Sequence, residues 1–177
     1  VSVATQPEHR AEIVIYAAEH GVKAIYAEKA LAASLEQADA MVDAIERNNV
    51  AFNMGANRRW APHYDKVKEV INSGDIGPLT SLVIFNTSPL FNSASHTFDT
   101  VMYLNNDHQA LWVQGHLPDD SMVDENTLHE DPQGEGIIQF DNDVRCYALL
   151  TGPRSDYQAI CKDGSITIIR DGEEFYF

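Results

Sequence analysis

The sequence has little basic charge. Its 177 residues include 12 Lys and Arg against 27 Asp and Glu, which gives a formal net charge of -15 at pH 7. This excess of acidic residues disfavours nucleic acid and anionic membranes as partners. Long apolar runs and a signal-peptide pattern are also missing. The composition, 44% hydrophobic, therefore predicts one large or two small globular domains with neither kind of partner.

Cysteine is scarce as well. Cys146 and Cys161 are the only two, and they have neither a C-x-x-C spacing nor a matching histidine cluster. We therefore expect buried, reduced thiols and a cytoplasmic location.

In the first third of the chain, short apolar segments alternate with helical ones. Pro7 suits the first position of a helix that ends at Gly21, and Ser34 with Gln37 forms a capping box for the next helix. The strands expected around them span residues 1–5, 22–27 and 50–54. This alternation predicts half of a doubly wound parallel sheet, with its strands buried on both faces.

After a third helix from Pro62 to Gly74, strands dominate. Turn signals such as Asp163-Gly164 join several of these runs into hairpins, and one helix is expected at 95–104. The expected strands are 79–85, 110–115, 136–140, 144–150, 157–161, 165–169 and 174–177. The predicted fold is thus α/β: a partial Rossmann-type parallel sheet in 1–58, then an α+β domain with a large, mostly antiparallel open sheet in 59–177. Its apolar open face predicts a homo-oligomer.

Lys29 follows the strand 22–27, at the end where parallel sheets bind ligands. A lysine there can donate a hydrogen bond to a substrate oxygen, and Glu28 would tune its proton affinity. An ordinary surface lysine is the alternative.

His96 is predicted at the start of the helix 95–104, with Ser95 as its N-cap. The positive end of the helix dipole disfavours imidazolium, so the ring would be neutral and able to take a proton, while Asp99 would oppose this or fix the tautomer. An ordinary polar histidine is the alternative. Alcohol oxidation by hydride transfer needs such a base and a cation or donor for the oxygen, roles that His96 and Lys29 can fill.

The acidic stretch 119–131 contains possible metal ligands at Asp119, Asp120, Asp124, Glu125 and His129. Because the order and glycine of an EF-hand are missing, we predict a solvated loop and no metal site.

A series of motifs in this order resembles the Gfo/Idh/MocA oxidoreductase family, from Val1 to about Asp107. The motifs are Val3-Ala4-Thr5-Gln6-Pro7 with His9, Glu28-Lys29-Ala30-Leu31-Ala32, Asn57-Arg58-Arg59-Trp60-Ala61-Pro62, Ser73-Gly74-Asp75-Ile76-Gly77-Pro78 and Ser95-His96-Thr97-Phe98-Asp99. The resemblance implies an NAD(P)-dependent dehydrogenase or reductase of sugars, polyols or related compounds.

The resemblance also implies site residues. Lys29 falls on the family's lysine that contacts substrate and cofactor, and His96 on its catalytic histidine; Ala30 replaces the proline of the Glu-Lys-Pro motif, and Asn92 replaces an assisting aspartate. Cofactor contacts are implied for Thr5, Pro7, His9, Glu28 and Lys29, and substrate contacts for Asn92, Asp99, Arg58 and Tyr64. For the turn 5–9 the alternative is plain turn chemistry, and for Arg58 and Tyr64 a solvated helix start.

The glycine-rich phosphate-binding turn G-x-G-x-x-G is absent. The chain also starts in what looks like an interior strand, so we expect a fragment that alone binds NAD or NADP weakly and is inactive. Two other hypotheses stay open: a non-catalytic ligand-sensing or regulatory relative, and a purely structural oligomerisation domain.

Overall fold

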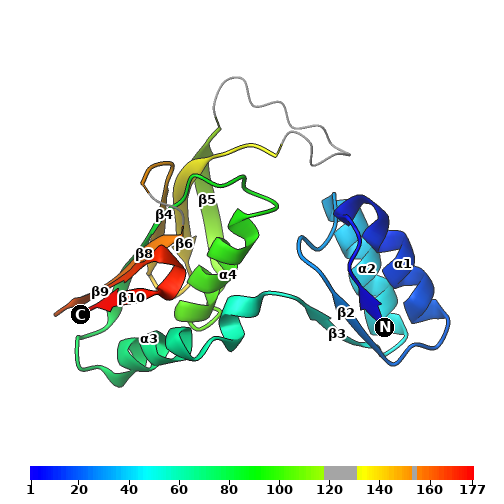
Figure 1. The fold of residues 1–177 in the computed structure, drawn as a ribbon, viewed down its shortest axis with the longest axis horizontal. Coiled ribbons are helices and arrows are strands. Elements are labelled where there is room, and N and C mark those ends of the chain that lie inside the picture. The colour runs from blue at the N-terminus through cyan, green and yellow to red at the C-terminus, as the bar shows by residue number, and fades with distance from the viewer. Residues whose placement is uncertain (118–130, 153–154) are drawn as a thin grey trace. The chain divides into compact units, whose positions relative to one another are not determined.

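The computed structural model describes residues 1–117, 131–152 and 155–177. Contacts divide the chain after Ala56 into two compact units, which we describe one at a time. The first unit contains α1, α2 and β1 to β3, and the second contains the elements from α3 onward (Figure 1).

The first unit is a three-stranded parallel sheet with two helices. Strands β1 (Ser2–Val3), β2 (Ala24–Ala27) and β3 (Ala51–Met54) lie side by side in chain order. Helices α1 (Pro7–Glu19) and α2 (Leu35–Arg47) connect them. Parallel strands in sequential order with right-handed crossovers place both helices on one face. The predicted parallel half-sheet is confirmed.

The ends of these helices follow from local chemistry. Pro7 is the first residue of α1, and Gly21, just beyond its end, has φ +81°. The hydroxyl of Ser34 accepts a hydrogen bond from the backbone N–H of Gln37 at 3.2 Å. The Gln37 side chain in turn accepts from the N–H of Ala33 at 3.1 Å. The predicted cap of α2 is therefore present, with its return bond one residue earlier than in the usual capping box.

Only one face of this small sheet is covered in the part of the chain that the structure describes. Ile25 and Ala27 of β2 are buried against α1 and α2, whereas Tyr26 between them is 47% exposed. The expectation of strands buried on both faces is wrong for these residues, because both helices cover the same side.

The second unit begins with the 3₁₀ turn η1 (Asn57–Trp60) and carries a seven-stranded sheet in the order β10-β9-β8-β4-β7-β6-β5. Strand β4 pairs with β7 in parallel, and the other pairings are antiparallel. The elements are α3 (Pro62–Ser73), β4 (Leu79–Phe85), α4 (Ala94–Leu104), β5 (Ala110–His116), β6 (Glu135–Phe140), β7 (Arg145–Leu149), β8 (Asp156–Cys161), β9 (Ser165–Ile169), η2 (Arg170–Gly172) and β10 (Glu174–Tyr176). The predicted fold class, a partial Rossmann-type sheet followed by a mostly antiparallel open sheet, is confirmed.

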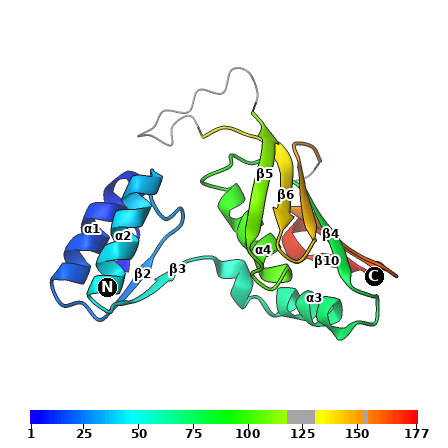
Figure 2. The ribbon, with the colours of Figure 1, turned by 180° about the vertical axis from the view of Figure 1, so that it is seen from behind.

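Helices α3 and α4 share one hydrophobic core with the sheet (Figure 2). Val67 and Ile71 from α3 and Val101 from α4 pack on residues such as Leu82 and Ile84 of the central strand. Cys146 and Cys161 are free thiols inside this unit, and burial raises the pKa of Cys146 to about 12. The expectation of buried thiols is confirmed.

Among the described helices, none is both long and apolar enough to cross a membrane. The predicted solvated loop at 119–131 lies outside the described residues, apart from Asp131. The described residues contain no group of three or more His, Cys, Asp or Glu side chains placed to hold a metal ion.

Candidate functional site

The first unit presents the carboxyl ends of its strands at one edge. Val3 pairs with Ala27, and Ala27 with Met54. Just beyond these pairs, the N–H of Glu28 donates to the carbonyl of Val3 at 3.0 Å. Thr5 and Lys29 leave the sheet at this edge, which is where open α/β sheets bind ligands.

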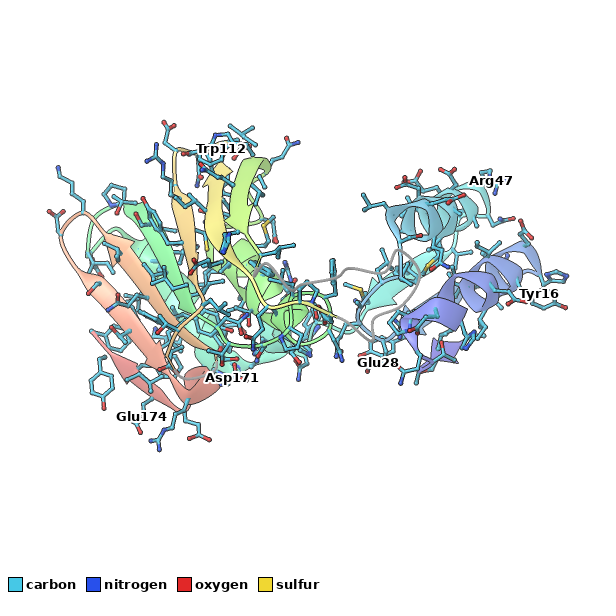
Figure 3. The ribbon with its side chains drawn as sticks, turned by 90° about the horizontal axis from the view of Figure 1, so that it is seen from above. Tyr16, Glu28, Arg47, Trp112, Asp171 and Glu174 are labelled. Atoms are coloured by element: carbon cyan, nitrogen blue, oxygen red, sulfur yellow. The ribbon has the colours of Figure 1, made fainter. Side chains whose placement is uncertain are left out.

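Lys29 lies where the sequence placed it, directly after β2, and is half-buried. Its backbone N–H donates to the Glu28 carboxylate at 3.3 Å, and the Lys29–Ala30 peptide bond is cis. Figure 3 shows Glu28 at the end of the first unit away from Tyr16 of α1. The position of Lys29 is confirmed, while its contact with substrate and cofactor stays a prediction.

The predicted cofactor residues Thr5, Pro7 and His9 form the turn into α1. Pro7 is buried, and His9 is exposed in the first turn. The N-cap residue, Gln6, makes no side-chain cap bond, and the buried Oγ1 of Thr5 has no hydrogen-bond partner among the described residues. A helix N-terminus favours anionic groups, and the contact of these three residues with a cofactor stays a prediction.

Sequence reasoning missed Arg10, which is only 1% exposed. One guanidinium nitrogen, Nη2, donates to the carbonyl of Thr5. Within the described chain, Nε and Nη1 are buried without a hydrogen-bond partner. Burial lowers the pKa of Arg10, and the negative charges of Glu28 and Glu8 oppose this. Helical spacing could have predicted that Arg10 is buried. It lies three residues after Pro7 and four before Val14, on the buried face of α1.

In the second unit, His96 is the third residue of α4 and is half-buried. Its predicted place in the first turn is correct, but Ser95 as N-cap is wrong. The N–H of Ala94 donates to the carbonyl of Pro89 at 2.9 Å, and the helix begins at Ala94. The Ser95 hydroxyl instead donates to the carbonyl of the exposed Asn92 at 2.7 Å. The catalytic role of His96 stays a prediction.

Asp99, one turn after His96, is held by Arg59, with 2.6 Å between Arg59 Nε and Asp99 Oδ1. Arg59 also donates two hydrogen bonds to the Asp107 carboxylate, from Nη2 to Oδ1 at 2.6 Å and from Nη1 to Oδ2 at 3.0 Å. The hydrogen bonds that Arg59 donates to Asp107 are the main reason that the pKa of Arg59 is raised; burial opposes this, and the bond to Asp99 and its charge add to it. Arg59 therefore links η1 to the middle of α4 at Asp99 and to the loop just after this helix at Asp107.

Arg58 and Tyr64, both predicted to bind substrate, meet at Asp171. Arg58 Nε lies 2.5 Å from one Asp171 carboxylate oxygen, and Nη2 donates to the other at 2.8 Å. The Tyr64 hydroxyl donates to the same carboxylate at 3.0 Å. Tyr64 has no exposed surface, and burial raises its pKa. This burial argues for a structural role of Tyr64 and against direct contact with a substrate.

A pocket of about 500 Å³ opens in the second unit between α4 and the end of the sheet at β5 and β6. Its lining is mainly apolar: Leu90, Phe91, Phe98, Val113, Gly115, His116, Leu117, Gly134, Glu135, Gly136, Ile138 and Ala148. Of these described residues, none is a predicted site residue.

No family model matches the sequence. Among curated relatives, an uncharacterised oxidoreductase YrbE of Bacillus subtilis is 31% identical over 96 residues, which cover 46% of this chain and 28% of the relative. The scyllo-inositol 2-dehydrogenase (NAD(+)) of the same organism is 35% identical over 77 residues, covering 44% and 22%. A levoglucosan dehydrogenase of Pseudarthrobacter phenanthrenivorans is 40% identical over 81 residues, covering 46% and 20%. The chain thus matches between a fifth and three tenths of these relatives' lengths.

Solved structures match over nearly the whole chain. A probable dehydrogenase from Thermotoga maritima has a TM-score of 0.73 at 20% identity, covering 94% of this chain and 56% of that one. A super-repressor mutant of Gal80p from Saccharomyces cerevisiae has a TM-score of 0.79 at 19% identity, covering 98% and 56%. At these identities the likeness establishes the fold.

The chain shares its fold with these solved structures: a parallel α/β sheet is followed by a large mixed sheet. Together with the ordered motifs and the curated oxidoreductases, this confirms the resemblance to the Gfo/Idh/MocA oxidoreductases, and the chain spans 56% of each of the two solved chains.

Proposed function

We propose that this chain serves in a nicotinamide-dependent oxidoreductase that interconverts the hydroxyl and keto forms of a sugar, polyol or related compound. Residues 1–58 would form part of the dinucleotide-binding domain, and residues 59–177 would bind substrate. The observation that carries the proposal is Lys29 at the ligand edge of a parallel sheet, beside Glu28, in a chain 35% identical to an NAD(+)-dependent inositol dehydrogenase over 77 residues.

In this proposal, the nicotinamide cofactor, NAD or NADP, supplies the hydride acceptor or donor when bound. Lys29 donates a hydrogen bond to the reacting oxygen and stabilises negative charge that develops on it. His96 takes the hydroxyl proton during oxidation and returns it during reduction. Its place in the first turn of α4 favours the neutral imidazole that a base requires.

The test uses the full-length protein with NAD or NADP and a panel that includes scyllo-inositol and levoglucosan. We expect Lys29→Ala and His96→Ala each to lower turnover by about 100-fold or more. Lys23→Ala and His108→Ala are controls in the same two units: Lys23 is exposed, and the His108 side chain is 41% exposed and bonds to Asp141. If neither site variant changes turnover on a polyol that the parent oxidises, the catalytic assignment is wrong.

A second candidate is a non-catalytic ligand sensor of the same fold. Asn92 stands where the family commonly has an acid, and an amide does not act as a base. The likeness to a super-repressor mutant of Gal80p also favours this reading. Binding of a nicotinamide dinucleotide with no turnover on the whole panel, in both the parent and Asn92→Asp, would support the sensor.

We also propose a homo-oligomer formed through the open face of the large sheet. On that face, Trp112 of β5, Leu149 of β7 and Ile160 of β8 are 45%, 37% and 36% exposed. The cross-strand row that joins Trp112 to Ile160 also holds the polar residues Gln139, Arg145 and Ser81. Apolar surface of this kind, on a sheet covered by helices on its other side, favours a second copy. Light scattering of the parent and of Trp112→Lys tests the oligomer, and a monomeric parent would refute it.

We also propose a cytoplasmic location, with which the free thiols of the second unit agree.

A further inference from the structure

Two consecutive arginines in η1 place positive charge beside α4 in the second unit. Arg59 forms ion pairs with two carboxylates, those of Asp99 and Asp107. Arg58 forms an ion pair with the carboxylate of Asp171. Two cations thus face three carboxylates, so these arginines and their partners together carry no net positive charge.

The carboxylate of Asp171, in η2 (Figure 3), is held by side chains and by its own backbone. Arg58 Nε lies 2.5 Å from Oδ1 and Nη2 donates to Oδ2 at 2.8 Å, while the buried Tyr64 hydroxyl donates to Oδ1 at 3.0 Å. The backbone N–H of Asp171 donates to the carbonyl of Ser155 at 3.2 Å. Asp171 has φ 58° and ψ 35°, a left-handed conformation that Asp and Asn adopt more readily than most residues. The negative charge is therefore fixed in contact with the guanidinium.

Arg58 keeps one nitrogen for a further acceptor. Within the described part of the chain, its Nη1 is buried and has no hydrogen-bond partner. Burial alone would lower the pKa of Arg58, but the hydrogen bond to Asp171 opposes this and the pKa is raised overall. A guanidinium paired with a carboxylate through two nitrogens retains its other N–H donors, although most of its charge is compensated. Such a group suits a neutral oxygen acceptor, because a second anion would meet the repulsion of the first.

We propose that Asp171 determines the ligand class of the second unit: it orients and neutralises Arg58, so that Nη1 donates to an oxygen of an uncharged polyol or sugar. A ligand that carries a carboxylate or phosphate at this point is disfavoured. This inference rests on the proposed function for the contact between Arg58 and substrate, and it narrows the substrate class of that function.

The test is binding to the full-length protein with NAD or NADP, measured by calorimetry with two matched pairs of ligands. The pairs are scyllo-inositol with its monophosphate, and glucose with glucuronate. We expect the parent to bind a neutral member about tenfold more tightly than its charged partner. Asp171→Asn keeps the size and the left-handed preference of the side chain but removes its charge, so this ratio should shift toward the charged ligand by about tenfold. Tighter binding of the charged member by the parent, or an unchanged ratio in the variant, overturns the proposal.

Glu173→Gln is the matched control. It removes one negative charge two residues away, from a side chain that is 70% exposed and lies 3.4 Å from Arg170. An equal shift in this variant would show a general charge effect and overturn the role of Asp171. In an Arg58→Met background, Asp171→Asn should no longer shift the ratio, because no guanidinium remains to be uncovered. A shift of the same size there would show that Asp171 does not act through Arg58.

Should Asp171→Asn fail to fold, Arg58→Met decides from the other side. It leaves the Asp171 carboxylate uncompensated, so the charged ligands should bind several-fold more weakly relative to the neutral ones. Arg170→Met is its control, since Arg170 is 60% exposed and pairs with Glu173 and Glu174. Equal ratios in Arg58→Met and the parent overturn the proposal.

Turnover of the same ligands separates this inference from the proposed function. If the parent binds the neutral members with the expected preference but oxidises none of the panel, the oxidoreductase proposal fails while the role of Asp171 stands. If the parent oxidises a charged member more efficiently than its neutral partner, the oxidoreductase proposal stands and the role of Asp171 is refuted. Binding of neither member of either pair also overturns the role of Asp171.

Discussion

The two units differ in the side chains that pack between their sheets and helices. In the first, half of the ten residues in the buried apolar cluster are alanines, the helices cover one side of the sheet, and Arg10 is buried. In the second, large residues such as Leu82, Ile84 and Phe140 fill the space between a seven-stranded sheet and two helices. Because apolar stabilisation scales with the area buried, the second unit should be the more stable by itself.

The largest effect should follow from a cavity in the second core. Ile84 is fully buried in the central strand β4, so Ile84→Ala should cost about 4 kcal/mol of unfolding free energy in that unit. Thiol labelling against denaturant measures it, because Cys146 and Cys161 are both buried there and react only after opening. Ile84→Val is the graded control, with an expected loss of about 1 kcal/mol. Equal losses in both variants would contradict a tightly packed core.

A cavity in the first core should have a somewhat smaller effect, confined to that unit. Met41 of α2 is fully buried, and Met41→Ala should cost about 3 kcal/mol. Hydrogen exchange at Ile25 and Ala27 reports on this unit, while thiol labelling should be unchanged. Val42→Ala, at the exposed neighbouring position, is the control. Faster labelling of the thiols in Met41→Ala would show that the two units unfold together.

Loss of the cap of α2 should be smaller still. Ser34→Ala removes the acceptor for the N–H of Gln37 and should cost about 1 kcal/mol in the first unit alone. Ser34→Asp keeps an acceptor and should retain most of the stability, as read by hydrogen exchange. A full loss in both variants would show that the hydroxyl is not the cap.

The smallest effect concerns acid stability of the second unit. The hydrogen bond from Arg59 is the main cause that lowers the pKa of Asp107 below 3.8, with burial opposing it. A depressed carboxyl pKa stabilises the folded state above the unfolded value and loses this as pH falls through the folded one. Below about pH 4, the free energy of unfolding of the parent should therefore fall more steeply than that of Arg59→Met. Unfolding is followed by circular dichroism, because thiol reactivity itself changes with pH. Because Asp107 is half exposed, salt should shrink the difference. If the unfolding free energies of the two proteins fall in parallel as the pH decreases, the ion pair does not contribute to acid stability.

Local signals predicted most of the elements. Gly21 and Gly74 both adopt positive φ at helix ends, and the Asp163-Gly164 turn joins antiparallel β8 and β9, as the sequence indicated. Each of these features depends on a few adjacent residues, so a single sequence contains the information.

Features that depend on distant residues were missed. The parallel pairing of β4 with β7 joins residues about sixty positions apart, and no local pattern shows it. Arg10 was missed because Glu28, whose charge opposes the effect of burial on its pKa, lies in another segment of the chain, after β2. The hydrogen bond from Tyr64 to Asp171, near the end of the chain, has no local signal either, and a substrate contact of Tyr64 stays a prediction. For the site, sequence placed Lys29 and His96 on the right local elements, and their joint role remains the proposal above.

The position of β4 in the large sheet has a consequence for synthesis on the ribosome. This strand is complete at Phe85, yet both of its neighbours, β7 and β8, are translated only from Arg145 onward. Until then its apolar residues have no sheet to join, and closing so long a loop is entropically slow. The nascent chain should therefore depend on chaperones over this interval, whereas the three strands of the first unit can pair as soon as residue 54 has emerged.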